Sequence, residues 1–261
     1  MATAPHHRFS HADPPKGDPL PIKVLDRASS RALDEAAITR LGIPGIVLME
    51  HAAQSVRRVS DHLRRQHGLR RVLIACGPGN NGGDGYALAR LLFNDGIDTH
   101  IIALGEPKEG SDAATNAAIC RSMKIDIVGP EELRELLDTP SLIIDALFGS
   151  GLDRPLEEKA AGIVAQLNAV DSPILAVDIP SGLDADTGRA TGQCVRADCT
   201  VTFVALKPAM LEVGSERYLG EVIVGDIGTP PALLDEFARV LPGPTADVDP
   251  KPPPPPKRRG P

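Results

Sequence analysis

The spacing of apolar residues changes near residue 70 of this chain. Before it, apolar residues recur three and four positions apart, which predicts helices over residues 29–41, capped by Ser29 or Ser30, and over residues 46–66. After it, short apolar runs alternate with helical spacing. The runs predict strands at residues 72–76, 99–104, 126–128, 142–146, 174–178, 200–205 and 222–224, and the segments between them predict helices at residues 85–94, 111–123, 131–137 and 157–169. Strands separated by helices indicate an α/β fold whose mostly parallel sheet is covered on both faces.

A glycine-rich turn, GPGNNGGDG, follows the first of these strands. Glycine lets the backbone approach a ligand closely, and the free N–H groups at the start of the next helix favour an anion. A helix cap from Asn81 or Asp84 would explain only one polar residue of the turn. The turn is not a P-loop, because Asp84 and Gly85 replace the Lys and Ser/Thr of that motif. A GxGxxG pattern can be drawn from Gly77, but a carboxylate beside pyrophosphate is repelled unless a cation or hydroxyl meets it. We therefore expect a nucleotide-like ligand that presents hydroxyl or ring atoms as well as phosphate.

Two further strands end in aspartates that precede glycine-bearing loops. Asp145 is followed by FGSGLDRP, and Asp178 is followed by IPSGLDADTG, which contains Ser181. Either aspartate alone could be a turn cap. The carboxyl ends of parallel strands meet at one edge, where ligands of such sheets bind. Together with Asn81, these oxygens suit a hard monovalent or divalent cation. Asp153 is close enough in sequence to join the pocket, whereas Asp184 and Asp186 are expected to be solvated.

Charge and composition narrow the function classes. The 261 residues carry a formal net charge of −7, which argues against a general binder of nucleic acid or anionic membranes. The four cysteines form no CxxC pair and suit a reduced cytosol, so a cytoplasmic location is expected. The sequence shows no secretory signal and no run of the ~18 to 20 apolar residues that span a membrane. We expect one domain over residues 22–240, between a disordered tail at residues 1–21 and a proline-rich disordered tail at residues 241–261.

Three motifs together resemble one family. GPGNNGGDG, DALFGSGLDRP and VDIPSGLDADTG are similar to the YjeF N-terminal family of NAD(P)H-hydrate epimerases, over about residues 26–234. LMEHAA resembles a fourth motif, with His51 and Ala53 where the family usually has Asn and Gly. In TVTFVALKP, Val204 stands where the family often has glycine, while Lys207 matches the usual lysine.

The resemblance implies a three-layer αβα sandwich with a Rossmann-like sheet and N-terminal helices. It also implies epimerisation of the R and S forms of NADHX and NADPHX, cofactors hydrated at C6 of the nicotinamide ring. A separate dehydratase would repair only the S form. By carry-over, a potassium ion would be held by Asn81, Asp145 and Ser181. The hydrated nucleotide would be bound by Asn80, Asn81, Gly82, Gly83, Asp84, Gly149, Ser150, Gly151, Leu152, Asp153, Arg154, Pro155 and Asp178.

Epimerisation of such a substrate requires a general acid/base. The C6 hydroxyl and ring N1 form a hemiaminal, so loss of the hydroxyl leaves a planar iminium that water can enter from either face. A carboxyl group in a closed pocket typically contributes ~10² to 10⁴-fold to such proton transfer. We expect Asp145 to be this acid/base, with Asp178 as the second candidate.

Three other interpretations compete with the separate epimerase. A fused dehydratase is not expected, because the chain is too short for that second domain. A non-catalytic scaffold of this family would be expected to lose site residues, yet Asn81, Asp84 and Asp145 all remain. An ordinary NAD-dependent dehydrogenase needs an acidic ribose-binding residue after the second strand, where Glu106 is a weak candidate. The sequence leaves a homodimer open.

Overall fold

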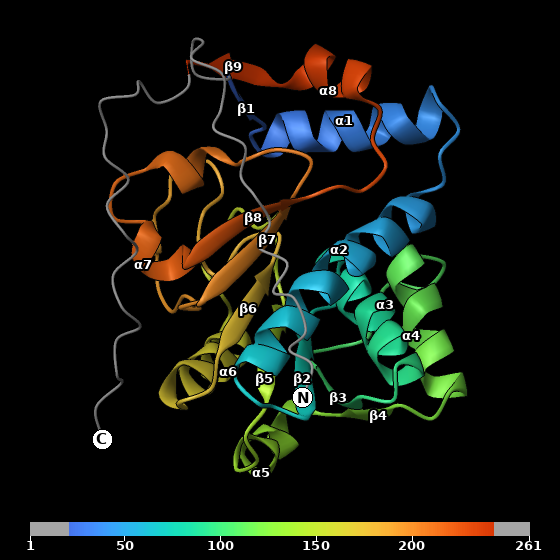
Figure 1. Ribbon diagram of the computed structural model, residues 1–261, viewed down its shortest axis with the longest axis vertical. Coiled ribbons are helices and arrows are strands. Elements are labelled where there is room, and N and C mark those ends of the chain that lie inside the picture. The colour runs from blue at the N-terminus through green and yellow to red at the C-terminus, as the bar shows by residue number, and fades with distance from the viewer. Residues whose placement is uncertain (1–20, 243–261) are drawn as a thin grey trace, which may run out of the picture.

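A computed structural model of the protein describes residues 21–242, and within them a seven-stranded sheet forms the centre of the molecule (Figure 1). Every pair of neighbouring strands in it is parallel, in the order β4-β3-β2-β5-β6-β7-β8. The strands are β2 (Arg71–Cys76), β3 (Asp98–Ala103), β4 (Asp126–Val128), β5 (Leu142–Ala146), β6 (Ile174–Val177), β7 (Cys199–Phe203) and β8 (Glu221–Gly225). All seven strands predicted from the apolar runs are present, so the α/β assignment is confirmed.

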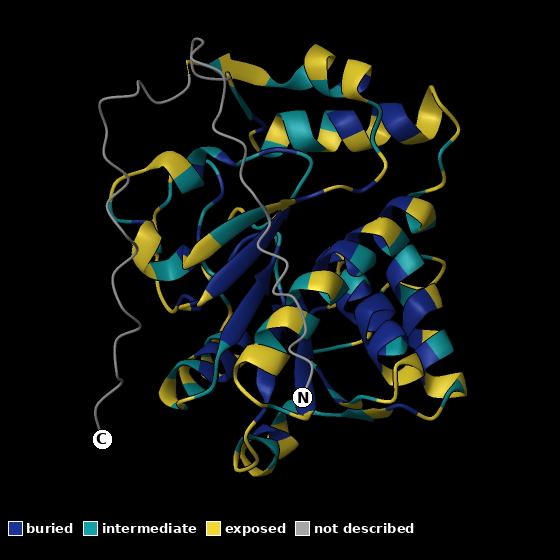
Figure 2. Ribbon diagram, viewed as in Figure 1, coloured by how far each residue is buried: buried dark blue, intermediate teal, exposed yellow. Residues whose placement is uncertain are grey.

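Helices cover both faces of the sheet. On one face lie α2 (Gly45–Gln66), α3 (Asn80–Asn94) and α4 (Asp112–Ser122), and on the other lie α5 (Leu133–Leu137) and α6 (Glu158–Ala169). Alternate residues of β2 supply the two cores, since Val72 and Ile74 face the first group while Leu73 and Ala75 face the second. Figure 2 shows the central strands buried and the outer helix surfaces exposed. The three-layer sandwich is therefore confirmed.

A small cap lies beyond the carboxyl ends of the strands. It consists of β1 (Ile22–Val24), α1 (Arg27–Thr39), α8 (Pro231–Phe237) and β9 (Arg239–Leu241), with α1 packed on α8 and β1 paired antiparallel with β9 (Figure 1). Only α1 was predicted from the sequence. The pairing of Ile22 with Leu241 carries regular structure one residue into the predicted C-terminal tail. Residues 1–20 and 243–261, where both disordered tails were predicted, lie outside the described residues.

The glycine-rich turn differs from its prediction, because α3 begins at Asn80 rather than at Gly85. Glycine is a poor helix former, so the sequence pattern indicated a loop. Close packing explains the difference. A Cβ atom on Gly82 would lie 1.8 Å from the carbonyl oxygen of Gly77, and one on Gly85 would lie 2.7 Å from Cys76 Sγ. These glycines let the first turns of α3 pack directly against the end of β2.

The remaining elements are short. Two 3₁₀ turns span Pro130–Glu132 and Pro208–Leu211, and a single helical turn, α7, spans Glu216–Leu219. In the described part of the chain, no helix has both the length and the apolar character needed to cross a membrane.

Candidate functional site

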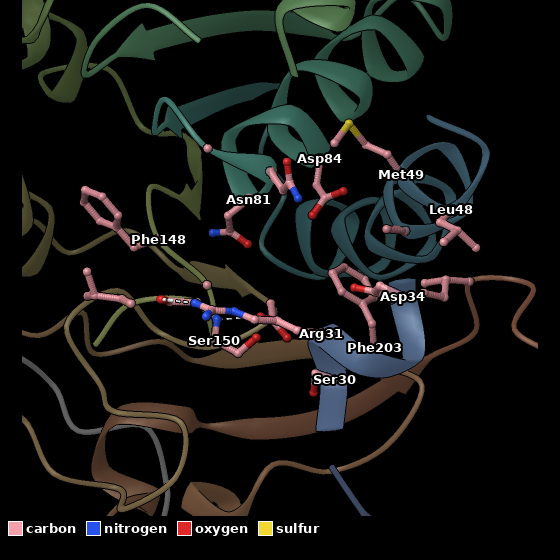
Figure 3. Close-up of a pocket in the computed structure, with 18 of the residues that line it drawn as sticks. Ser30, Arg31, Asp34, Leu48, Met49, Asn81, Asp84, Phe148, Ser150 and Phe203 are labelled. Carbon is pink, nitrogen blue, oxygen red and sulfur yellow. Dashed lines mark hydrogen bonds between the residues drawn. The ribbon is translucent and has the colours of Figure 1, made fainter. Parts of the chain in front are cut away.

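A cavity of about 550 Å³ lies between the cap helix α1 and the carboxyl edge of the sheet (Figure 3). Its walls come from α1, α2, the first turns of α3 and the segments that follow β5, β6 and β7. In Figure 3, Asn81 and Asp84 point from α3 into a space that faces Arg31 and Asp34 of α1. The three strand-end loops predicted to meet at one edge do so here.

Most of the predicted nucleotide-binding residues line this cavity. They are Asn80, Asn81, Asp84, Gly149, Ser150, Gly151, Leu152, Asp153, Arg154 and Asp178. Three others do not. Gly82 and Gly83 pack inside α3, where a Cβ on Gly83 would lie 2.6 Å from the Met49 side chain, and Pro155 lies just past the cavity wall. Direct ligand contact by these three stays a prediction that the geometry does not favour.

Asp178 is held at the cavity wall by two donors. Its Oδ2 accepts a hydrogen bond of 2.6 Å from the Ser150 N–H, and its Oδ1 lies 3.4 Å from Lys207 Nζ. Lys207 is almost fully buried and also donates to Thr202 Oγ1 at 3.0 Å. Burial raises the pKa of Asp178, but Lys207 and the Ser150 N–H outweigh it, so the net pKa lies below the usual range. Asp178 is therefore an ionised carboxylate at the edge of the cavity.

Asp84 and Asp34 face the same cavity, but their pKa values are raised rather than lowered. Burial, then the charges of Asp178 and Asp34, raise the pKa of Asp84 well above its usual range. Burial and Asp178 raise the pKa of Asp34 to about 6, although Asp34 stays open to solvent at the cavity mouth. The cavity thus combines a carboxyl group whose pKa is lowered with one whose pKa is raised well above its usual range. Environments that push two pKa values apart are typical of an acid and a base.

Asp145 is placed differently from the expectation. Its side chain is fully buried below the cavity floor and does not line the cavity. Oδ1 accepts from Ser181 Oγ at 2.6 Å and from the Leu147 N–H at 3.3 Å, and Oδ2 accepts from the Ser181 N–H at 2.8 Å. Burial raises its pKa to about 6, against the opposing effect of these donors. The role of Asp145 as acid/base stays a prediction, and this burial favours the second candidate, Asp178.

The residues predicted to hold potassium fit a hard cation in their chemistry. Asp145 and Ser181 are bonded to each other, and the donors that reach Asp145 are all uncharged, so this buried carboxylate lacks a basic partner among the described residues. Asn81 is buried at the cavity, where its amide oxygen would be the cation ligand, whereas its Nδ2, a donor, has no partner within residues 21–242. Carboxylate, hydroxyl and amide oxygens suit a hard ion rather than a transition metal. No group of three or more His, Cys, Asp or Glu in the described chain is arranged for a metal. Potassium stays a prediction.

The cap supplies a residue, Arg27, that the motifs did not indicate and that holds the loops of the site. Arg27 of α1 donates to the carbonyl oxygens of Ser150 and Leu152, both at 2.8 Å, and pairs with Asp184 at 2.7 Å. Arg27 also pairs with Asp186 at 3.2 Å, so these two aspartates are not simply solvated. The sequence showed α1 only as an amphipathic helix. Nothing in its polar face indicated which loop it would hold, because that contact joins segments more than 120 residues apart.

Of the three departures from the family pattern, His51 and Val204 have different consequences. His51 is exposed and lies 3.7 Å from the position of a Cβ on Gly228, outside the cavity lining. Val204 lines the cavity and has φ 67°, a left-handed conformation in which a β-branched residue is strained. A glycine would adopt this conformation freely, which explains why it suits the position.

Comparison with known proteins fixes the family. Residues 45–209 match the model of the family described as YjeF-related protein N-terminus. The chain belongs to this family. It is 40% identical to the NAD(P)H-hydrate epimerase of Limosilactobacillus fermentum over 205 residues, covering 78% of this chain and 96% of that protein. It is 39% identical to the protein of the same name from Pirellula staleyi over 222 residues, covering 82% and 96%.

Two further relatives differ in length or sequence. The bifunctional NAD(P)H-hydrate repair enzyme Nnr of Pyrobaculum aerophilum is 41% identical over 197 residues, which cover 73% of this chain but 39% of that enzyme. The crystal structure of the yeast protein ynu0, YNL200c, superposes with a TM-score of 0.71 at 25% identity, covering 83% of this chain and 93% of that one. The YjeF-related fold expected from the motifs is therefore confirmed.

Proposed function

We propose that this chain is an NAD(P)H-hydrate epimerase, an isomerase that interconverts the R and S forms of NADHX and NADPHX. The observation that carries the proposal is its match to relatives of this name over 96% of their length. The cavity supports it, because the three family motifs contribute residues to one space. A non-catalytic scaffold would need no such convergence of carboxyl groups.

The reaction needs only proton transfers and water. An acid donates a proton to the C6 hydroxyl, the C6–O bond breaks as the N1 lone pair forms an N1=C6 double bond, and water leaves. Water then adds to either face of the planar iminium, and a carboxylate accepts its proton. The substrate and product differ only in configuration at C6. No oxidant or reductant enters.

We assign the two proton transfers to Asp84 and Asp178. Burial raises the pKa of Asp84, the direction that suits an acid, and Asp178 is kept ionised by Lys207 and the Ser150 N–H. Both side chains line the cavity, so both can reach a ligand there. The positive charge of the iminium would be stabilised by the Asp178 carboxylate. Asp145 then acts below the cavity rather than on the substrate.

Potassium is part of the proposal as a resident ion. Asn81, Asp145 and Ser181 would hold it, and the bound ion would supply a fixed positive charge that neutralises the buried Asp145 carboxylate. The end of β5, which carries Asp145, and the loop that carries Ser181 would be joined more tightly. The functional partner that we propose is a separate dehydratase specific for the S form. A homodimer stays a prediction.

A coupled assay tests the proposal. A mixture of R and S NADHX is incubated with an S-specific dehydratase, ATP and potassium chloride, and the slow loss of the R form is followed by its absorbance. We expect the protein to accelerate that loss, and Asp178→Asn to accelerate it far less. An intact, folded protein that leaves the R form at its spontaneous rate would contradict the proposal and favour the scaffold.

A further inference from the structure

A second hollow, of about 510 Å³, lies beyond the carboxyl ends of β3 and β4. Its walls include Leu104, Glu106, Arg121, Ile127, Val128 and Lys159. The end of β2 lies between it and the first cavity. The Leu104 N–H donates to the carbonyl oxygen of Cys76 at 2.9 Å, and the residues just after Cys76, Pro78 and Gly79, line the first cavity.

The strand order indicates that the two hollows face different halves of one ligand. If the strands are renumbered with β2 as strand 1, their order across the sheet is 3-2-1-4-5-6-7. The first six have the order of the Rossmann fold, in which the strand order reverses between β2 and β5. A dinucleotide binds across that reversal, with its two halves on opposite sides. The first cavity lies over β5, β6 and β7, where Asp178 and Lys207 face the proposed hydrated nicotinamide. The hollow lies on the other side, over β3 and β4.

The residues of the hollow match the adenosine half in chemistry. Leu104, Ile127 and Val128 offer apolar walls to an adenine ring. Glu106 follows the second Rossmann strand, the place from which an acidic residue accepts the ribose 2′-hydroxyl of an NAD-type ligand. Its carboxylate pairs with the Arg121 guanidinium at 2.6 Å, and both side chains are exposed. A nearby arginine is the usual partner of a 2′-phosphate.

We propose that this hollow binds the adenosine half of the substrate, and that Glu106, Arg121 and Lys159 set the preference between NADHX and NADPHX. The inference rests on the proposed function. Glu106 accepts the ribose 2′-hydroxyl of NADHX. When the 2′-phosphate of NADPHX enters, Arg121 turns from Glu106 to the phosphate and Lys159 adds a second positive charge. The ion pair is exposed, so exchanging one partner for the other carries only a small cost.

Two substitutions should shift the preference in opposite directions. Lys159→Met lowers kcat/KM for NADPHX about tenfold, the effect of one charge-assisted hydrogen bond, and leaves kcat/KM for NADHX nearly unchanged. Glu106→Gln removes the carboxylate that repels the 2′-phosphate, so it raises kcat/KM for NADPHX severalfold while lowering that for NADHX. Arg65→Met is the matched control, because Arg65 is exposed near the end of α2, away from both hollows. It should shift neither value.

A binding measurement separates this inference from the proposed function. Calorimetric titration with 2′,5′-ADP reports on the hollow whether or not the protein is active, and Lys159→Met should weaken that affinity about tenfold. Activity of the unsubstituted protein with an unchanged NADHX to NADPHX ratio in both variants would overturn the inference and leave the epimerase standing. If the unsubstituted protein is inactive but Lys159→Met still weakens 2′,5′-ADP binding, the adenosine-binding role of the hollow is supported and the epimerase function is contradicted. Equal 2′,5′-ADP binding by Lys159→Met and the unsubstituted protein would also overturn the inference.

Discussion

Two aspartates at neighbouring strand ends have opposite environments. Asp145 lies in β5, fully buried among uncharged donors, and its pKa is raised to about 6. Asp178 follows β6, lines the cavity beside Lys207, and has a lowered pKa. The strand register explains the contrast, because Asp145 pairs with Ala176 of β6. Asp178 therefore stands two residues farther along, at the level of Leu147, where the strand has ended.

Backbone conformation completes the difference. Asp178 has φ 66°, a left-handed conformation that aspartate tolerates better than most residues. Its side chain leaves the alternation of the strand and faces the cavity. Asp145 keeps extended strand geometry within β5 and bonds to Ser181 instead. In this sheet, one acid lines the cavity while the other joins the end of β5 to the loop after β6.

The largest effect is expected from Asp178→Asn. Loss of its charge removes both the base and the stabilisation of the iminium, so kcat should fall by about 10² to 10⁴-fold. Per folded molecule, Asp145→Asn should lose far less, because its side chain does not line the cavity. The coupled assay measures both variants after circular dichroism confirms the fold. A greater loss of kcat in Asp145→Asn would reverse our assignment.

The double variant Asp178→Asn/Lys207→Met is the control for this comparison. Either single change leaves a buried charge without its partner, which destabilises a protein by about 3–5 kcal/mol for a fully buried pair. The pair here is 3.4 Å apart, with side chains 3% and 13% exposed. Removing both charges should recover stability relative to Lys207→Met alone but recover no activity. Chemical denaturation of all four proteins gives the coupling free energy.

Much of the fold was predictable because it depends on local patterns. Apolar runs and glycine-bearing strand ends placed every strand of the main sheet and the edge at which the loops meet. The cap was less predictable from the sequence. β1 and β9 are short strands at the two ends of the described chain, and their pairing depends on a contact between Ile22 and Leu241 that no local pattern contains. The start of α3 was misplaced because packing of Gly82 overrides its low helix propensity.

The sequence predicted which residues belong to the site but not how deeply each of them is buried. Motifs identified Asn81, Asp84 and Asp178, which all line the cavity. The same motifs made Asp145 and Asp178 look equivalent, because the sequence does not contain the two-residue offset between β5 and β6. Arg27 was missed for a related reason. Its partners lie in loops that follow β5 and β6, and only the folded chain brings α1 to them.

Asp145→Asn should lower stability by about 1–3 kcal/mol. An amide offers its NH₂ group to one of the three donors around this side chain, so a buried donor loses its acceptor. The same variant tests potassium. If the ion binds here, potassium chloride should raise the thermal midpoint of the unsubstituted protein more than choline chloride does, and Asp145→Asn should lose that difference. Asp153→Asn is the matched control, because Asp153 lines the cavity without belonging to the proposed ion site. Equal midpoints in both salts for the unsubstituted protein would contradict the potassium site.

A smaller effect is expected at Val204. Alanine and glycine both remove its side-chain packing, so comparing Val204→Ala with Val204→Gly isolates the strain of its left-handed backbone, φ 67°. Glycine should be the more stable of the two by about 1 kcal/mol, the reverse of their usual order. Urea denaturation of both variants measures the difference. Val47→Ala and Val47→Gly, at an exposed position in α2, should show the usual order. Equal stabilities at Val204 would mean that its backbone is not strained.

The smallest effect concerns the carboxyl group that faces Asp178 across the cavity. The pKa of Asp34 rises from 3.8 to about 6 on folding, because the cavity walls desolvate its carboxyl group even though part of the side chain stays exposed to solvent, and because of the charge of Asp178, with Lys207 opposing. A raised folded pKa means that its contribution to stability is complete at low pH and is lost as the pH rises through about 6. Asp34→Asn should therefore match the unsubstituted protein near pH 4 and exceed it above about pH 6, by at most about 1 kcal/mol because Asp34 is exposed. Asp145 titrates in the same window, but it is present in both proteins and cancels in the difference.

Urea denaturation across that range measures the difference in stability between Asp34→Asn and the unsubstituted protein. Glu35→Gln, which removes an exposed carboxylate of α1 that does not line the cavity, is the control. A gap that is constant with pH, or that also appears in Glu35→Gln, would mean that Asp34 does not share the field of Asp178.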